Sequence, residues 1–181
     1  SHWKDWLKEN GACIQYAFLN RPHISVKYID LVRQYTPARI IYYGHDLHFL
    51  RERREYELTG QKDLLKSSED WKKKELELTK RAMEGLGALP YVHILGSKDP
   101  ANHTGIVSFT IDGVHPHDVS EILSSDGIDV RAGHHCAQPL LEYLGVRSST
   151  RASMMFYNTP EEIDALIESV STIRRRMGYG E

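Results

Sequence analysis

Residues 105–111, Gly-Ile-Val-Ser-Phe-Thr-Ile, are rich in the β-branched and aromatic residues that favour strands, and Val92-His-Ile-Leu95 has the same character. A helix is predicted from Pro116 to Leu123, because proline fits the first turn of a helix. Ile128-Asp-Val-Arg131 predicts a further short strand. Since strands and helices alternate, the second half of the chain is predicted to be an α/β unit.

The alternation continues to the C-terminal end of the sequence. Residues 139–144 predict a helix that Gly145 closes as a left-handed C-cap, and residues 149–157 predict a strand. The last helix is predicted to begin at Thr159-Pro160, an N-cap followed by proline. Arg174-Arg-Arg176 suit the dipole at its end better than they suit a polybasic partner site. Its buried face is predicted to hold Ile163, Leu166, Ile167, Val170 and Ile173.

The first half has a different pattern. Residues 12–19 predict a buried strand, residues 26–35 a helix that ends before Pro37, and residues 39–43 a second strand, which together form a βαβ-like segment. Residues 47–86 are heavily charged and predict two helices broken at Thr59-Gly60. Their Lys and Glu clusters are interpreted as a solvated face rather than a binding surface. The apolar stripe consists of Leu76, Leu78, Ala82, Met83 and Leu86. The predicted fold class is α/β with mixed α+β character and strands in both directions.

Composition narrows the classes of function. The 181 residues are 40% apolar and 27% charged, with a net charge of −2, so neither a strongly basic nucleic-acid binder nor a membrane protein is expected. No apolar run approaches the roughly 20 residues of a membrane helix, and no signal-peptide pattern opens the sequence, so we expect a cytoplasmic protein. The two cysteines, Cys13 and Cys136, lack CxxC spacing and are expected to be free thiols.

The candidate chemistry lies in Arg131-Ala-Gly-His-His-Cys-Ala-Gln-Pro139. Gly133 allows a sharp turn that presents Cys136 at the exit of a strand. His134, His135 and Arg131 are placed to lower the thiol pKa, which is how a cysteine becomes a nucleophile at neutral pH. An inert, buried cysteine is the alternative interpretation.

These residues carry a resemblance that runs from about Lys80 to Arg176. The sequence is similar, in order and spacing, to the C-terminal small domain of group II (Suf-type) cysteine desulfurases, which are class V aminotransferase-like enzymes of PLP fold type I. The motifs are Gly105-Ile-Val-Ser-Phe109, Val114-His-Pro-His-Asp-Val119, Val130-Arg-Ala-Gly-His-His-Cys-Ala-Gln-Pro-Leu140, Thr150-Arg-Ala-Ser153 and Tyr157-Asn-Thr159.

The resemblance implies roles for individual residues. In the family, pyridoxal phosphate weakens the bond to the sulfur of substrate L-cysteine, and a cysteine takes that sulfur as a persulfide and leaves L-alanine. Cys136 would be the sulfur carrier, and Arg151 would bind the substrate carboxylate. Arg131, Gly133, His134 and His135 belong to the supporting loop, where a proton-transfer role and a plain structural role for the histidines both stay open. A sulfur-acceptor protein is a possible partner in iron–sulfur cluster assembly.

The resemblance does not extend to the lysine that binds the cofactor. No strand followed by a Ser-x-His-Lys-like turn occurs in residues 1–80, so the lysine that binds pyridoxal phosphate is not identified and no cofactor is expected on this chain. Residues 20–32 and 38–51 instead resemble part of the N-terminal Rossmann-like domain of nucleotide-sugar glycosyltransferases. We therefore expect a chimera with a glycosyltransferase-like segment in residues 1–78 and a desulfurase-like domain in residues 79–181, with Ser1-His2 as a tag remnant and a homodimer as the assembly.

The sequence evidence for a ligand or metal site elsewhere is weaker. His45 and Asp46 follow a strand, where α/β proteins place ligands, but they suit a turn and a helix N-cap equally. Metal binding by these residues with His48, or by His115 with His117, has low specificity at such spacing, and no metal site is expected. Three hypotheses stay open: a catalytically incomplete desulfurase fragment, a persulfide-accepting or partner-binding module, and a structural chimera without activity.

Overall fold

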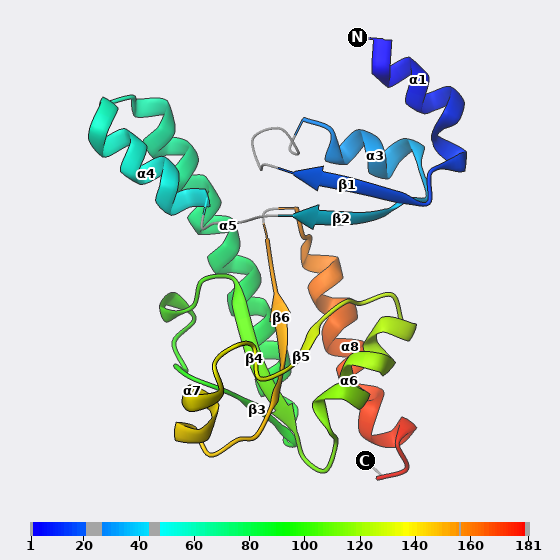
Figure 1. The fold of residues 1–181 in the computed structure, drawn as a ribbon, viewed down its shortest axis with the longest axis vertical. Helices are drawn as coiled ribbons and strands as arrows, with labels where there is room; N and C mark the ends of the chain where they lie inside the picture. Colours follow the sequence, from blue (N-terminus) through cyan, green and yellow to red (C-terminus); the bar gives the residue numbers. More distant parts are fainter. Residues whose placement is uncertain (1, 21–26, 44–47, 156, 180–181) are drawn as a thin grey trace. The chain divides into compact units, whose positions relative to one another are not determined.

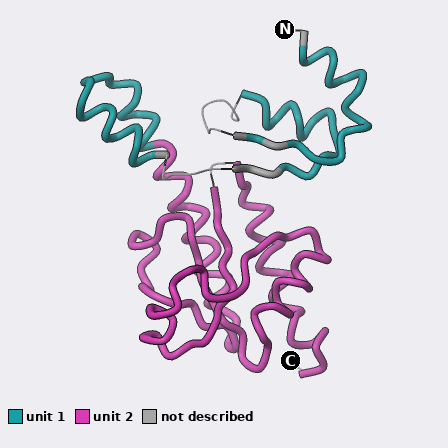
Figure 2. Tube along the Cα trace, viewed as in Figure 1, with its two compact units in different colours: residues 1–69 teal, residues 70–181 magenta. Residues whose placement is uncertain are grey.

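A computed structural model describes residues 2–20, 27–43, 48–155 and 157–179. The chain divides into two compact units, unit 1 with residues Ser1–Glu69 and unit 2 with residues Asp70–Glu181 (Figure 2). Among the described residues, no helix combines the length and the hydropathy that a membrane crossing requires.

Unit 1 contains a parallel two-stranded sheet. Strands β1 (Tyr16–Asn20) and β2 (Arg39–Tyr43) pair in parallel, with Ala17 opposite Ile40, and α3 (Ile29–Tyr35) connects them in sequence (Figure 1). The predicted order of strand, helix and strand is therefore confirmed. The elements before and after it are α1 (His2–Asn10), η1 (Gly11–Cys13) and α4 (His48–Thr59).

The start of the first strand was wrongly predicted. Ala12 and Cys13 belong to the 3₁₀ turn η1, because the Ile14 amide donates to the Gly11 carbonyl at 3.0 Å and closes a helical turn. Gly11 is needed there, since a Cβ on it would lie 2.2 Å from the Tyr35 carbonyl oxygen. The break between the two charged helices is confirmed: α4 ends at Thr59, Gly60 has a φ of 71°, and α5 (Lys62–Gly87) follows.

Unit 2 is built on a four-stranded antiparallel sheet. The strands are β3 (Val92–Ile94), β4 (Ile106–Ile111), β5 (Arg131–Gly133) and β6 (Ser149–Ser153), in the spatial order β3-β4-β6-β5. Between and after them come η2 (Pro100–Asn102), α6 (Pro116–Ser125), α7 (Gln138–Tyr143) and α8 (Pro160–Arg176). Together with the parallel pair in unit 1, this confirms an α/β fold with mixed strand directions.

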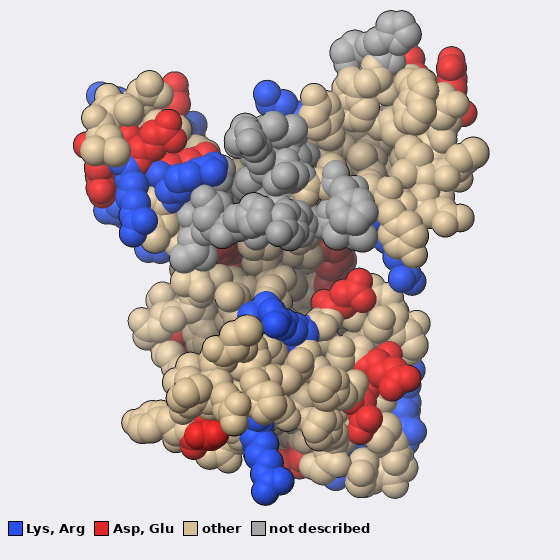
Figure 3. Space-filling model, in the orientation of Figure 1, with Lys and Arg blue, Asp and Glu red and all other residues tan. Residues whose placement is uncertain are grey.

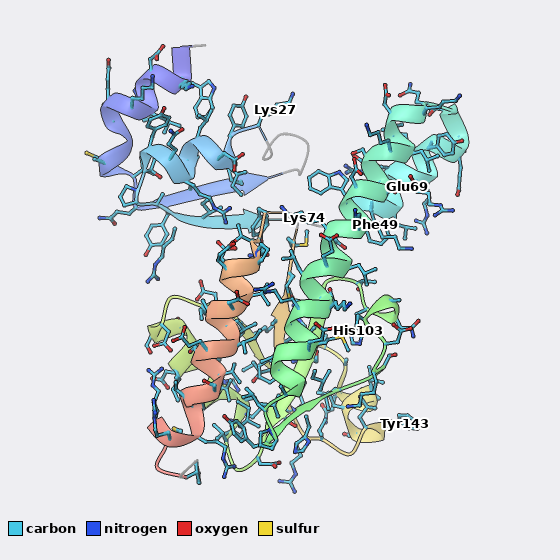
Figure 4. All side chains as sticks on the ribbon, turned by 180° about the vertical axis from the view of Figure 1, so that it is seen from behind. Lys27, Phe49, Glu69, Lys74, His103 and Tyr143 are labelled. Carbon is cyan, nitrogen blue, oxygen red and sulfur yellow. The ribbon has the colours of Figure 1, made fainter. Side chains whose placement is uncertain are left out.

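The core of unit 2 lies on one face of this sheet. Alternate residues of β4 are buried, and so are Thr150 and Ala152 of β6. Helices α5 and α8 lie beyond the sheet in Figure 1 and in front of it in Figure 4. Period-2 alternation in the strands and helical spacing in the helices direct their apolar side chains into this one layer. The core includes Leu86, Val107, Phe109, Ile111, Val119, Leu123, Ala152, Leu166, Val170 and Ile173.

Helix ends in unit 2 follow the sequence signals. Thr159 caps α8 in a reciprocal capping box with Glu162, and Gly145 has a φ of 74° just after α7. At the end of α8, Arg174 donates to the Asp112 carbonyl and Arg176 to the Asp126 carboxylate, both at 2.5 Å. These two arginines are therefore engaged within unit 2.

Three predictions in unit 2 were wrong in detail. The β5 strand starts at Arg131 instead of ending there, because the Ile128 amide donates to Leu123 at the end of α6 and not to a neighbouring strand. The β6 strand ends at Ser153, since the Met155 amide donates to the Asn158 side chain at 2.8 Å. Leu76, placed in the buried stripe, is 38% exposed.

Candidate functional site

The face of the unit 2 sheet opposite the core carries polar side chains. Phe109 on β4 and Ala152 on β6 are buried against the helices. Their neighbours along the same strands, Ser108 on β4 and Arg151 on β6, point to the other face and are half-buried. Arg131 on β5 is exposed. Because period-2 alternation governs all three strands, these polar side chains share one face, called here the open sheet face.

Strand register brings two arginines together on the open sheet face. Arg151 is paired with Ser108 on one side and with Arg131 on the other. Like charges directly opposite each other in a sheet are destabilising, so an anion bound near both guanidinium groups would relieve their repulsion. The Nε of Arg151 is buried and has no hydrogen-bond partner among the described residues. Arg131 and Arg151 are therefore suited to bind an anion together.

Residues 134–137, called here the Cys136 loop, begin where this ladder ends. Gly133 pairs with Ser149 in the last step between β5 and β6, and Gly133 has a φ of 120°, which favours glycine. His134 is exposed, and its carbonyl accepts from the Ala137 amide at 2.8 Å to close a turn. Cys136 is an exposed free thiol in this turn, so the interpretation of it as a buried residue is wrong.

His135 connects the loop to β6. Its Nε2 lies 3.0 Å from both the carbonyl oxygen and the hydroxyl oxygen of Ser149, which is fully buried. Burial lowers the pKa of His135, the bond to Ser149 opposes this effect, and electrostatic repulsion from Arg151, Arg131 and His134 lowers the pKa further. His135 therefore favours its neutral form.

Sequence reasoning did not identify Ser149 or Ser108 as members of the site. Ser149 stands two residues before Arg151, so the period-2 rule for strands was a signal that both lie on one face. Ser108 had no such signal, because its place beside Arg151 depends on the register between β4 and β6.

The described residues of unit 2 do not fit a pyridoxal phosphate site. The cofactor requires a lysine for its Schiff base. Within the described part of unit 2, the lysines lie on α5, where Figure 4 labels Lys74, or at Lys98 after β3, and none comes from β5, β6 or the Cys136 loop. No cofactor step is therefore assigned to these residues.

Charged and metal-binding side chains outside the open sheet face give little evidence for a second site. On the side of unit 2 seen in Figure 3, Lys and Arg form separate spots on a largely uncharged surface. The rings of His115 and His117 stack with centroids 5.3 Å apart, but no group of three metal-ligating side chains occurs among the described residues. His45 and Asp46 lie outside the described residues.

Comparison with known proteins gives a consistent result. Residues 64–166 match the family model described as aminotransferase class-V. A protein of Halalkalibacterium halodurans named "Probable cysteine desulfurase" is 45% identical over 107 residues, which cover 59% of this chain and 26% of that protein. A Staphylococcus aureus protein of the same name is 44% identical over 108 residues, which cover 59% and 26%. The chain thus spans about a quarter of the length of these relatives.

Solved structures of cysteine desulfurases share the fold of somewhat more than half of this chain. The apo enzyme of Thermococcus onnurineus superposes with a TM-score of 0.58 and 38% identity, covering 60% of this chain and 27% of that one. Escherichia coli CsdA, in a form with an S-sulfonic acid, gives a TM-score of 0.52 and 34% identity, covering 56% and 25%. These neighbours are PLP enzymes of fold type I.

Proposed function

We propose, from the premise that this chain belongs to the class-V aminotransferase family, that unit 2 carries the sulfur-accepting cysteine and the carboxylate-binding arginine of a cysteine desulfurase. Cys136 would take up sulfur that originates from L-cysteine and hold it as a persulfide. The observation that carries this proposal is the exposed thiol of Cys136, directly beyond a sheet face that presents Arg131 and Arg151.

The chemistry of Cys136 is a sulfur transfer without net oxidation. The thiolate attacks the outer sulfur of a persulfide donor and forms a new sulfur–sulfur bond. The donor's own sulfur–sulfur bond breaks, and its inner sulfur leaves as a thiolate, while a proton is exchanged with solvent. An exposed position in a turn suits this reaction, because a donor has to approach in line with the bond that breaks.

Arg151 is suited to hold the carboxylate of a cysteine-derived donor. A guanidinium offers paired N–H donors that match a carboxylate. The Nε of Arg151 is buried and has no hydrogen-bond partner among the described residues. Arg131 opposite it adds a second positive charge. A bound carboxylate would satisfy both.

A second candidate function is acceptance of sulfur that another polypeptide has already released. The observation that favours it is that no described lysine of unit 2 comes from the strands of the open sheet face or from the Cys136 loop. When bound in a desulfurase, pyridoxal phosphate supplies the electron sink for cleavage of the carbon–sulfur bond. Unit 2 would then receive and pass on sulfur, with a sulfur-acceptor protein as the recipient. The glycosyltransferase-like origin of residues 1–78 remains a separate proposal.

The test uses the full chain and two matched sulfur donors. L-Cysteine persulfide has a carboxylate, and cysteamine persulfide is the same molecule without it. We expect both to add one sulfur atom to Cys136, as read by mass spectrometry of the peptide. Arg151→Gln is expected to slow transfer from L-cysteine persulfide by about tenfold, the value of one charged hydrogen bond, and to leave transfer from cysteamine persulfide unchanged.

Two controls complete the test. Cys136→Ser removes the accepting thiol, and L-cysteine with pyridoxal phosphate replaces the persulfide donor. Sulfur on Cys136 from L-cysteine and pyridoxal phosphate would support a complete desulfurase and overturn the second candidate. Transfer from the persulfide alone would favour the second candidate. Failure of both donors to modify Cys136 would leave the structural chimera as the surviving hypothesis.

A further inference from the structure

The Cys136 loop is attached to β6 at one place beyond the strand ladder. The backbone pairing of β5 with β6 stops at Gly133 and Ser149. Two residues later, the imidazole of His135 contacts the Ser149 carbonyl and hydroxyl at 3.0 Å. A side chain thus extends the connection between these two chain segments into the loop, immediately before Cys136.

We propose that His135 is a positioning residue for Cys136, whose Nε2–H bond to Ser149 holds residues 135 and 136 in the backbone conformation that presents the thiol. This inference rests on the proposed function and adds to it, because it gives a role to one of the two loop histidines. His135 contacts neither the donor nor the transferred sulfur in this role. It acts through the backbone of its neighbour.

The tautomer of His135 follows from its partner. A carbonyl oxygen only accepts hydrogen bonds, so Nε2 has to carry the proton. The neutral ring then has an unprotonated Nδ1, which is buried and without a hydrogen-bond partner among the described residues. Burial and the neighbouring charges of Arg151 and Arg131 lower the pKa of His135, which agrees with a single proton at Nε2. The bond to Ser149 is therefore available at neutral pH.

The backbone around Cys136 needs such a restraint. His135 has a φ of 55° and Cys136 a φ of 59°, and they are the only non-glycine residues with positive φ within the described ranges. Left-handed conformations are unfavourable for residues with a Cβ and persist where surrounding contacts hold them. The bond from His135 to a fully buried serine is a contact of this kind. Without it, the loop is expected to relax and the thiol to lose its fixed direction.

The experiment compares four variants of the full chain, with L-cysteine persulfide as donor. His135→Ala removes the bond, and His135→Gln keeps an N–H donor on a side chain of similar reach. His135→Gly removes the bond but allows positive φ without strain. His117→Ala is the control, because His117 is an exposed imidazole on α6, outside the loop that carries Cys136. Far-UV circular dichroism and thermal unfolding establish that each variant is folded.

We expect His135→Ala and His135→Gly to slow sulfur transfer to Cys136 at least about fivefold, the equivalent of one lost hydrogen bond. His135→Gln is expected to restore most of the rate, and His117→Ala to leave it unchanged. A full rate in His135→Ala, or in His135→Gly, would overturn the inference, because the bond would then not position the thiol. Failure of His135→Gln to restore a rate that His135→Ala lowers would overturn it as well.

Two readouts do not depend on sulfur chemistry. The ¹⁵N shifts of the His135 ring are expected to show the neutral tautomer with its proton on Nε2. The amide of Ala137, which closes the turn at Cys136, is expected to exchange faster in His135→Ala than in His135→Gln. If wild-type protein accepts no sulfur, the proposed function is wrong. The two readouts still test whether His135 positions Cys136. A proton on Nδ1 alone, or unchanged exchange at Ala137, would refute it.

Discussion

Glu75 provides a quantitative test of the packing of unit 2. Its side chain lies on α5 and is only 7% exposed. Its Oε2 lies 3.7 Å from the position of a Cβ added to Gly105, at the start of β4. Burial raises the pKa of Glu75 from 4.5 to about 7. The substitution Glu75→Gln keeps the shape and removes the charge.

The sign and size of the effect follow from this pKa. Below pH 4.5 the carboxyl is protonated in both the folded and the unfolded states, so it imposes no charge penalty. Between pH 4.5 and about 7 the unfolded state loses the proton first, and the stability of unit 2 falls. Above pH 7 the ionised carboxylate imposes its full cost of about 3 kcal/mol, at about 1.4 kcal/mol for each pKa unit.

The assay is urea unfolding of the full chain, followed by the methyl NMR signals of Val107 and Ile111 in the core of unit 2. Glu75→Gln is expected to match wild type at pH 4 and to exceed its unfolding free energy by about 3 kcal/mol at pH 8.5. The exposed Glu77 on the same helix gives the control variant Glu77→Gln, for which we expect little change at either pH. A difference between Glu75→Gln and wild type that does not grow with pH would refute the reasoning.

Three further predictions concern unit 2. Thr159→Ala removes the N-cap of α8 and should lower the unfolding free energy by about 1 kcal/mol in the same urea assay, and no loss would show that the cap is dispensable. Gly105→Ala places a Cβ 2.6 Å from the Met154 carbonyl at a φ of 70° and should cost about 1–3 kcal/mol, whereas an unchanged midpoint would contradict this close approach. Arg81 donates two bonds of 2.6 Å to Asp164 and lowers the pKa of that carboxyl, so the pair stabilises the fold at neutral pH and loses this effect as the pH falls through the lowered pKa. In an NMR titration, Arg81→Ala should return the pKa of Asp164 towards its ordinary value, and an unshifted curve would argue against the ion pair.

Local signals in the sequence predicted the helix ends of unit 2 well, whereas α1 in unit 1 was not predicted. Thr159-Pro160 and Gly145 mark helix ends through backbone preferences that tertiary packing does not override. Strand ends were predicted less well. The apolar content of Ile128 and Val130 indicates burial, because both pack against the core, and it does not indicate pairing in a ladder.

The candidate site was predictable only in part. A family resemblance in the sequence pointed to Cys136 and Arg151, and the structure places both in or next to the β5–β6 pair. The position of Arg131 opposite Arg151 depends on the register of two strands that are separated in sequence by residues 134–148, which include α7. The bond from His135 to Ser149 joins residues 14 apart through a side chain, and no local propensity predicts it.

The most direct test of the central claim is a competition between two thiols within one chain. Cys13 in unit 1 and Cys136 in unit 2 are both exposed and free, and Cys136 follows the strand that pairs Arg131 with Arg151. Full-length protein is treated with limiting L-cysteine persulfide, and peptide mass spectrometry locates the added sulfur. We expect sulfur on Cys136 well before Cys13. Equal labelling of the two cysteines, or faster labelling of Cys13, would contradict it.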